Sequence, residues 1–385
     1  MSKKETDLLY LGRDPNKYGK CVNTPIYRSS TFIYETVEDF LHDEKPAHTD
    51  IAYGRSGTPT IHELESAMAN LEGTDHCLLT SSGMSAICIA ILSFARSGDH
   101  ILIPDNAYKC SRRFADEELS KMGIECTYYD PNLTDGLHEL IKPNTKIIMM
   151  ESPGSGTYEV QDVRAICKIA QSKNITTIID STWATPLFFN PKKYGVDIIV
   201  ESLTKYISGH ADIIMGAICF DSKHNNAIRS TFRNYGAIPS PDNAYLALRG
   251  LRTLNVRIKQ HESSALKIAQ WLEKHDKVVK VMHPGLESAE THHLWRRDFS
   301  GSTGVFGVVL KKTDISALYK AINMLQFFAI GLSWGGYESL IVPYDLHKSP
   351  SISKRIPQGN CIRLNIGLEN PEDLIQDLDK VLKKL

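Results

Sequence analysis

Short apolar segments that alternate with amphipathic segments are the feature that most restricts how this chain can fold. Runs of four to seven residues, rich in isoleucine and valine, recur between residues 77 and 220, and stretches with helical spacing of apolar residues separate them. Strands of this kind form a mostly parallel sheet with helices on both faces. Such a sheet binds ligands at the carboxyl ends of its strands, and we therefore expect the chemistry directly after the apolar runs. The clearest runs are CLLT at 77, HILIPD at 100, KIIMMESP at 146, TTIIDST at 176, VDIIVES at 196 and IIMGAICF at 213.

The sequence divides into three parts. Residues 1–58 lack a long periodic segment and contain several turn-forming residues, which indicates an arm. Residues 59–241 contain the alternating segments described above and form the larger predicted domain. Residues 242–385 begin with a long helical stretch and contain fewer strands, which predicts a smaller α/β domain. A total length of 385 residues suits two such domains.

Composition and charge narrow the possible partners. A net charge of -1 gives no electrostatic reason to expect nucleic acid or a membrane surface. The eight cysteines are scattered without a CxxC pair or a Cys/His cluster at zinc spacing, so we expect free thiols and no metal site. The charged N-terminus does not resemble a signal peptide, and no apolar run approaches membrane-spanning length, which favours a cytoplasmic location.

Two strand ends carry residues suited to an anionic ligand and a cation. The segment SSGMSA at 81–86 opens a predicted helix, where free N–H groups favour an anion and Gly83 would let a phosphate approach the backbone. Small residues at such a turn are also common without this function, so both interpretations stay open. Asp180 ends an almost wholly apolar run, where a carboxylate is costly unless it is paired. The alternative for Asp180 is a helix N-cap, since Ser181 and Thr182 follow it.

Lys205 is the strongest candidate for chemistry. A lysine at a buried strand end, close to groups that favour its neutral form, can attack a carbonyl and make a Schiff base. Ser202 and Thr204 would supply hydroxyl groups to a phosphate beside it. Taken alone, such a lysine is more often a solvated side chain. Together with the Gly83 turn and Asp180, on successive predicted strands, it indicates an aldehyde cofactor that bears a phosphate.

These motifs resemble the pyridoxal-phosphate (PLP) enzymes of cysteine and methionine metabolism. The pattern S-x-T-K-Y-x-x-G-H at 202–210 is similar to the lysine site of that family, and the resemblance extends over nearly the whole chain. It implies fold-type I, the PLP transferase-like fold, with pyridoxal 5'-phosphate as cofactor. The other motifs in the family's order are AYGRSGTPT at 52, ESPGS at 151, LRGLRTL at 248, WRRDFSGSTGVF at 295, SWGGYESL at 333 (numbered from its serine) and IRLNIGLE at 362.

The resemblance assigns roles in the larger predicted domain. Lys205 would bind the cofactor aldehyde and, once freed by substrate, shuttle protons. Asp180 would pair with the pyridine nitrogen and keep it protonated. Tyr108 would stack on the ring and take part in catalysis, although without the resemblance an ordinary packed tyrosine is equally plausible. The phosphate would be bound by the backbone at Gly83 and Met84 and by the hydroxyls of Ser202 and Thr204.

Further roles fall on the arm and on the C-terminal domain. Tyr53 and Arg55 match family residues that reach the phosphate of a neighbouring subunit, with Tyr53 also near the substrate, which implies a dimer at least and typically a homotetramer. Arg363 lies within an apolar run, where a guanidinium needs an anion, and a grip on the substrate carboxylate fits this requirement. Ser333 and Trp334 would line the substrate pocket.

The resemblance implies β-elimination of L-cystathionine to homocysteine, pyruvate and ammonia in methionine biosynthesis (transsulfuration). The aromatic SWGGYESL segment is closest to the β-lyase pattern. Leu332, however, is neither the Glu of the γ-enzymes nor the Tyr expected of a bacterial β-lyase, and Leu203 replaces a small residue. The alternatives are cystathionine γ-synthase, γ-lyase or methionine γ-lyase chemistry, a side activity on L-cysteine, racemisation of L-alanine, or a binding protein that has lost turnover.

Overall fold

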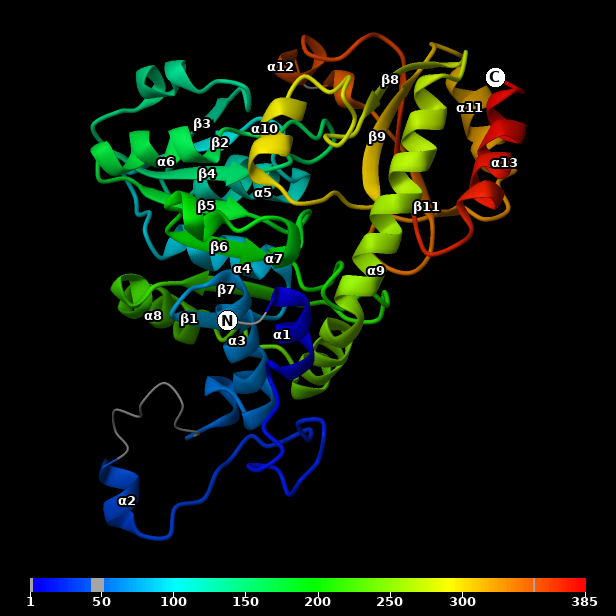
Figure 1. Cartoon of the computed structure of the whole chain (residues 1–385). Helices are drawn as coiled ribbons and strands as arrows, with labels where there is room; N and C mark the ends of the chain where they lie inside the picture. The colour runs from blue at the N-terminus through cyan, green and yellow to red at the C-terminus, as the bar shows by residue number, and fades with distance from the viewer. Residues whose placement is uncertain (1–2, 43–51, 349) are drawn as a thin grey trace.

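The computed structural model describes residues 3–42, 52–348 and 350–385, and these residues form two sheets with helices around them (Figure 1). The larger sheet has seven strands in the order β1-β7-β6-β5-β4-β2-β3, and β7 alone runs in the direction opposite to the other six. This confirms the predicted mostly parallel sheet. The strands are β1 (His76–Thr80), β2 (His100–Pro104), β3 (Glu125–Tyr129), β4 (Thr145–Glu151), β5 (Thr176–Asp180), β6 (Ile198–Glu201) and β7 (Gly216–Phe220).

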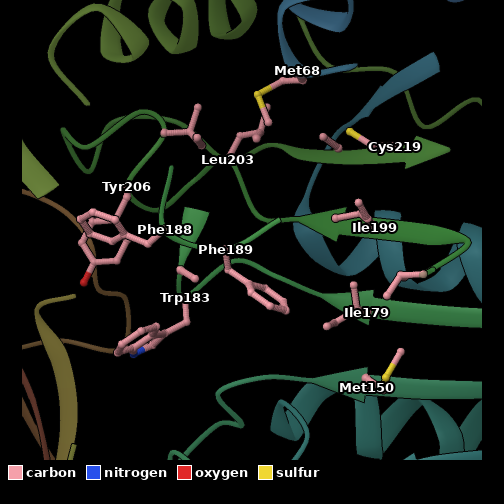
Figure 2. Close-up of a cluster of buried hydrophobic side chains, with 14 of the residues drawn as sticks. Met68, Met150, Ile179, Trp183, Phe188, Phe189, Ile199, Leu203, Tyr206 and Cys219 are labelled. Carbon is pink, nitrogen blue, oxygen red and sulfur yellow. The ribbon is translucent and has the colours of Figure 1, made fainter. Parts of the chain in front are cut away.

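Alternating side chains of the larger sheet enter two separate apolar clusters. Ile179 belongs to the cluster beneath α3, α6 and α7, whereas its neighbour Ile178 belongs to the cluster beneath α4 and α8. Both faces are therefore buried, which explains why these strands are continuous apolar runs rather than alternating ones. Figure 2 shows Ile179, Ile199 and Met150 side by side in the first cluster. The helices are α3 (Pro59–Glu72), α4 (Gly83–Leu92), α5 (Lys109–Phe114), α6 (Val163–Ser172), α7 (Thr185–Phe188) and α8 (Asn225–Tyr235).

The 33-residue helix α9 (Pro241–Glu273) connects the two sheets. Its first half, including Leu251, packs in the cluster of the larger sheet, and its second half, including Ile268, packs on the smaller sheet. The division after residue 241 stays a prediction. The smaller, five-stranded sheet has the order β10-β11-β12-β9-β8. Its elements are β8 (Val278–Met282), α10 (His292–Asp298), β9 (Val305–Leu310), α11 (Ile315–Ile322), β10 (Ala329–Ile330), β11 (Leu340–Tyr344), α12 (Pro350–Ser353), β12 (Asn360–Asn365) and α13 (Pro371–Leu382).

The N-terminal segment has two parts with different environments. Helix α1 (Lys4–Tyr10) packs on its own chain: Leu8 is only 1% exposed, and the Arg252 guanidinium donates to the carbonyls of Leu8 and Leu11 at 2.6 and 2.7 Å. By contrast, α2 (Val37–His42) lies away from the body of the molecule (Figure 1) and leaves Val37 and Phe40 exposed. No helix within the described ranges combines the length and apolar character needed to cross a membrane.

Two local expectations differ from the structure. The apolar spacing in SRRFADEELSKMG predicts one helix over 111–123, but α5 ends at Phe114 and a π-helical turn, Ala115–Leu119, follows it. The sequence PYDLHKSPSISKRIPQG predicts a long loop at 343–359, but this stretch begins inside β11 and contains a 3-10 turn, Leu346–Lys348, and the short helix α12. The spacing of apolar residues indicates that the first segment is helical, but it does not distinguish the hydrogen-bond pattern of an α-helix from that of a π-helix.

Candidate active site

The carboxyl ends of three adjacent strands bring the candidate residues together. Asp180 is the last residue of β5, where it is in register with Glu151 at the end of β4. Lys205 follows the end of β6 by four residues and lies in the turn between β6 and β7. Parallel neighbours end at the same edge of a sheet, so the chain order alone places these groups side by side.

The Lys205 side chain contacts the segment between β10 and β11. Its ammonium nitrogen, Nζ, is 2.9 Å from the Ser333 hydroxyl and 5.2 Å from the centre of the Trp334 ring. Burial lowers the pKa of Lys205 to about 8, with Arg363 acting in the same direction and Asp180 opposing it. A lysine in this environment has a substantial neutral fraction near neutral pH, and a neutral amine is the nucleophilic form.

Asp180 is held by the residue two positions along the chain. One of its oxygens accepts from the Thr182 backbone N–H at 3.0 Å and from the Thr182 hydroxyl at 2.5 Å. Burial raises the pKa of Asp180, while the Thr182 hydrogen bonds and Lys205 lower it. The N-cap alternative is not observed, because helix α7 begins at Thr185 and its N-cap residue is Ala184.

Glu151 is a site residue that the sequence reasoning missed. Its two oxygens accept from the Tyr108 backbone N–H at 2.6 Å and from the Ser155 hydroxyl at 2.5 Å. Burial, followed by the charge of Asp180, raises the pKa of Glu151 to about 8. The same signal that identified Asp180, an acid at the end of a buried apolar run, was present in KIIMMESP.

The start of α4 is a candidate anion site. The side chain of Ser82 caps the helix by accepting from the Ser85 N–H at 3.0 Å, which leaves the N–H groups of the first two helical residues, Gly83 and Met84, without a partner in the helix. Ser202 lies against this turn: a β-carbon added to Gly83 would stand 2.8 Å from the Ser202 hydroxyl oxygen. Glycine is therefore required where the two segments meet.

The Thr204 hydroxyl is already engaged. It donates to the carbonyl of Met215 at 3.2 Å and accepts from the Met215 N–H at 3.0 Å. Thr204 thus lies in the same turn as Lys205, but its hydroxyl bonds to the backbone of Met215, the residue before β7. Its expected role toward a phosphate stays a prediction.

Arg363 on β12 organises the segment that carries Ser333. Its Nη2 donates to the carbonyls of Gly331, Leu332 and Ser333 at 3.2, 2.7 and 2.9 Å. Its buried Nε has no hydrogen-bond partner among the described residues. Arg363 therefore has a free N–H donor, and it is close enough to Lys205 to lower the pKa of that amine. A guanidinium of this kind can donate hydrogen bonds to the carboxylate of a ligand.

Three candidate residues, Tyr108, Tyr53 and Arg55, are more exposed to solvent. Tyr108 precedes α5 and is 43% exposed, and burial of its hydroxyl region raises its pKa to about 12. Tyr53 is 46% exposed, and the Arg55 guanidinium lies 5.4 Å from the centre of its ring. The pair lies on the arm, where Gly54 donates its backbone N–H to Ser30 at 2.8 Å.

Comparison with known proteins agrees with this geometry. Residues 5–383 match the family described as Cys/Met metabolism PLP-dependent enzyme. The chain belongs to this family. It is therefore a PLP-dependent enzyme of fold-type I.

Individual relatives carry different reaction names. The chain is 41% identical to an L-alanine/L-glutamate racemase of Wolbachia pipientis, with 100% of this chain and 98% of the relative covered. It is 38% identical to the cystathionine beta-lyase MetC of Escherichia coli, with 98% and 97% covered. The crystal structure of metB from Corynebacterium glutamicum matches with a TM-score of 0.90 and 30% identity, covering 100% of this chain and 98% of that one.

The described side chains fit the cofactor that this family uses. A phosphate requires free donors, and the first turn of α4 offers them beside the Ser202 hydroxyl. A protonated pyridine nitrogen is stabilised by a carboxylate, and Asp180 supplies one at the end of β5, the strand that pairs with β6. An aldehyde requires an amine with a lowered pKa, and Lys205 has one.

Proposed function

We propose that the chain catalyses β-elimination of L-cystathionine, releasing homocysteine, pyruvate and ammonia. The observation that supports this most directly is the Lys205 amine between Asp180 on one domain and Ser333 and Trp334 on the other. The tryptophan of SWGGYESL fits the β-lyase pattern, and the Escherichia coli β-lyase aligns along nearly the whole chain.

In this proposal the larger domain holds the cofactor. The N–H groups of Gly83 and Met84 bind the phosphate together with the Ser202 and Thr204 hydroxyls, the latter after rotation away from Met215. Asp180 pairs with the ring nitrogen, and Tyr108 covers the ring. When bound, the cofactor supplies an electron sink for charge that develops at the substrate Cα.

The residues of this chain then divide the work of proton transfer and orientation. The neutral Nζ of Lys205 removes the Cα proton, which leaves it positively charged near the oxygen of Ser333. Arg363 orients the substrate carboxylate through its unused donors. Trp334 limits the length of the pocket, so that a sulfur on Cβ rather than Cγ reaches the position from which it leaves.

The proposed site also needs a second copy of the chain. Tyr53 and Arg55 lie on the exposed arm, and we propose that they complete the phosphate site of a neighbouring subunit in a homotetramer located in the cytoplasm. Mixing an inactive Lys205→Ala chain with an inactive Arg55→Ala chain tests this. Hybrid dimers should regain up to half the activity of one dimer, whereas no recovery after confirmed subunit exchange would contradict the shared site.

A second candidate function is racemisation of alanine or glutamate. The specific observation in its favour is the 41% identity to a racemase across the full length of both chains. Leu332, 85% exposed, also departs from the β-lyase pattern next to Ser333. Racemisation uses the same loss of the Cα proton but returns a proton to the opposite face.

One assay separates the two candidates. The purified, cofactor-loaded protein is incubated with L-cystathionine, L-alanine, L-glutamate and L-methionine in turn, and keto acids and amino-acid enantiomers are measured. Pyruvate and homocysteine from cystathionine as the fastest reaction support β-elimination. D-Alanine or D-glutamate as the dominant product supports racemisation, and dominant α-ketobutyrate indicates a γ-enzyme.

A further inference from the structure

The turn between β2 and α5 determines where Tyr108 lies. It runs from Asp105 to Tyr108, and Asp105 and Asn106 within it are almost completely buried. Glu151 fixes its end by accepting the Tyr108 N–H. The other half of the turn is fixed by a residue that is 250 positions away in the sequence, Arg355.

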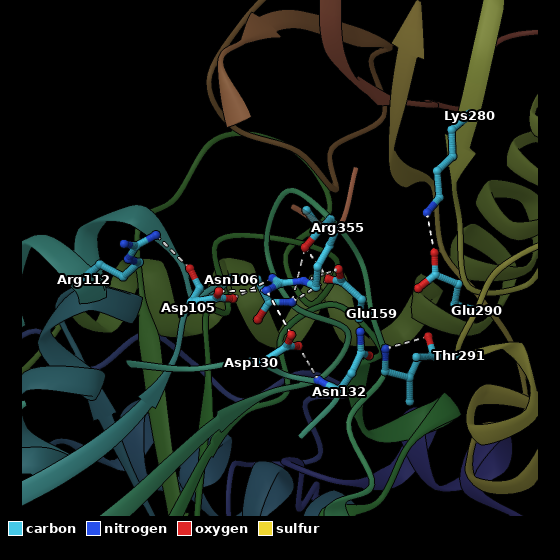
Figure 3. A network of polar contacts seen from close by, with 12 residues as sticks. Asp105, Asn106, Arg112, Asp130, Asn132, Glu159, Lys280, Glu290, Thr291 and Arg355 are labelled. Carbon is cyan, nitrogen blue, oxygen red and sulfur yellow. Dashed lines mark hydrogen bonds and ion pairs between the residues drawn. The ribbon is translucent and has the colours of Figure 1, made fainter. Parts of the chain in front are cut away.

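Arg355 binds the Asp105 carboxylate through two parallel hydrogen bonds. Its Nη1 donates to one oxygen at 2.8 Å and its Nη2 to the other at 2.6 Å, while its Nε lies 3.3 Å from Glu159 (Figure 3). The Arg355 side chain is 10% exposed and that of Asp105 is 3% exposed. Asp130 lies 3.5 Å from Nη1 at the open side of the cluster. A forked pair of this kind fixes both distance and orientation.

Glu159 extends the cluster to the loop after β4. It accepts from the Asn106 side-chain amide at 2.8 Å and also binds the Thr157 hydroxyl. The Asn106 amide in turn lies over Gly154, where an added β-carbon would stand 2.1 Å from it. The loop that carries Ser155, a partner of Glu151, is thereby packed against the turn that carries Tyr108.

The segment that carries Arg355 is anchored on the larger sheet and its loops. Ile352 and Ile356 are buried in the apolar cluster of the larger sheet, and the Arg355 N–H donates to the carbonyl of Ile352 at 2.9 Å. Tyr344, at the end of β11, donates its hydroxyl to the carbonyl of Gly156 at 2.6 Å. Residues 344 and 352–356 therefore lie against the larger sheet and its loops rather than over the smaller sheet.

We propose that Arg355 is a positioning residue for the active site, which sets the orientation of the Tyr108 ring through Asp105 and Glu159. This rests on the proposed role of Tyr108 at the cofactor, although not on which amino acid is the substrate. The ion pairs of Arg355 are with Asp105, Asp130 and Glu159, and the proposed role acts through these residues. Arg355 makes the position of one wall of the site depend on the docking of the C-terminal domain.

The test compares Arg355→Gln and Arg355→Lys with the control Arg297→Gln. Arg297 also bridges two carboxylates, Asp162 and Asp298, but neither of these partners belongs to the turn at residues 105–108, and the Arg297 side chain is 37% exposed. We expect Arg355→Gln to weaken binding of pyridoxal phosphate to the cofactor-free protein at least tenfold. Arg355→Lys, which keeps the charge without the fork, should give a smaller loss, and Arg297→Gln should bind as the unaltered protein does.

Hydrogen exchange of the cofactor-free protein gives a readout that does not depend on turnover. Backbone amides of residues 105–112 should exchange faster in both Arg355 variants and unchanged in Arg297→Gln. If Arg355→Gln fails to fold, Arg355→Lys alone decides. Exchange at 105–112 and cofactor affinity equal to those of the control variant would overturn the proposal, whatever happens to global stability.

A double-mutant cycle with Tyr108→Ala, which removes the ring that Arg355 is proposed to orient, tests whether Arg355 acts through Tyr108. Coupled residues give losses in kcat/KM that are less than additive, whereas a purely structural residue gives additive losses. We expect kcat/KM of the double variant to be within about threefold of that of the less active single variant. Full additivity would also overturn the proposal. Failure of the proposed β-elimination would appear instead as a different product from the unaltered protein, with the exchange result unchanged.

Discussion

The lowered pKa of Lys205 predicts a reactive amine in the cofactor-free protein. Burial brings the pKa of this amine to about 8, against 10.5 for an unperturbed lysine. At pH 7 about one Lys205 in ten would be neutral, compared with about one in three thousand for an ordinary lysine. Reagents that attack only neutral amines should therefore label Lys205 preferentially.

The assay is competitive labelling of the cofactor-free protein with trace acetic anhydride between pH 6 and 11, followed by peptide mass spectrometry. The peptide that contains Lys205 should reach half of its maximal labelling near pH 8. Lys121 serves as the internal control, because it is exposed and the adjacent Glu118 raises its pKa. Its labelling should rise only above pH 10.

The difference between the labelling midpoints of Lys205 and Lys121 shows whether the pKa of Lys205 is lowered. A Lys205 midpoint within half a pH unit of the Lys121 midpoint would show that the amine is solvated, and the account of the site given above would fail. Slow labelling with a midpoint that is still near pH 8 would show restricted access with the pKa as described. A midpoint reports the pKa, whereas a plateau rate reports access, so the two causes are separable.

Three further predictions use other described residues. The negative charge of Asp180 raises the pKa of Lys205, against the effects of burial and Arg363. Asp180→Asn removes this charge, so the labelling midpoint of Lys205 should fall below pH 8 in the same experiment. Burial and the nearby Glu72 raise the pKa of Glu201 well above 4.5, so the folded protein retains a proton that the unfolded chain loses, and stability falls as pH rises above about 4.5. Glu201→Gln should therefore be more stable than the unaltered protein in urea unfolding at pH 8, with a difference that shrinks below pH 4.5; an equal difference at both pH values would contradict this. Phe306→Ala empties a fully buried position in the smaller domain and should lower the free energy of unfolding by about 3–5 kcal/mol, measured by urea unfolding, and a loss below about 1 kcal/mol would show that the site collapses.

The periodicity of the sequence predicted the larger sheet because burial on both faces leaves a direct compositional trace. Ile178 and Ile179 enter opposite clusters, and no polar residue could replace either without cost. The same trace located Asp180, a charged group at the end of such a run, and Lys205, which follows the end of another run by four residues. Glu151 carries the same signal, an acid at the end of a buried apolar run, but the turn after the next predicted strand contains no lysine.

Other features leave no local trace in the sequence. Arg355 lies in a polar stretch that reads as a loop, and its importance depends on Asp105, 250 positions earlier. The Thr204 hydroxyl was assigned to a phosphate, yet its hydrogen bonds to Met215 follow from how the chain turns after β6. Both depend on tertiary contacts between segments whose separation in sequence carries no periodic pattern.

The position of Lys205 between two domains has a consequence for how relatives of one fold come to differ in reaction. The larger domain supplies Asp180 and the helix N-terminus that suit the cofactor, whereas Ser333, Trp334 and Arg363 come from the smaller one. Changes in the 331–338 segment can therefore alter which bond of the substrate is aligned for cleavage, or which face receives a proton, while the amine and its carboxylate partner stay in place. We therefore expect the racemase and the beta-lyase named among the relatives to differ mainly on the side of the site that corresponds to Ser333 and Trp334, because loss of the Cα proton is common to both reactions.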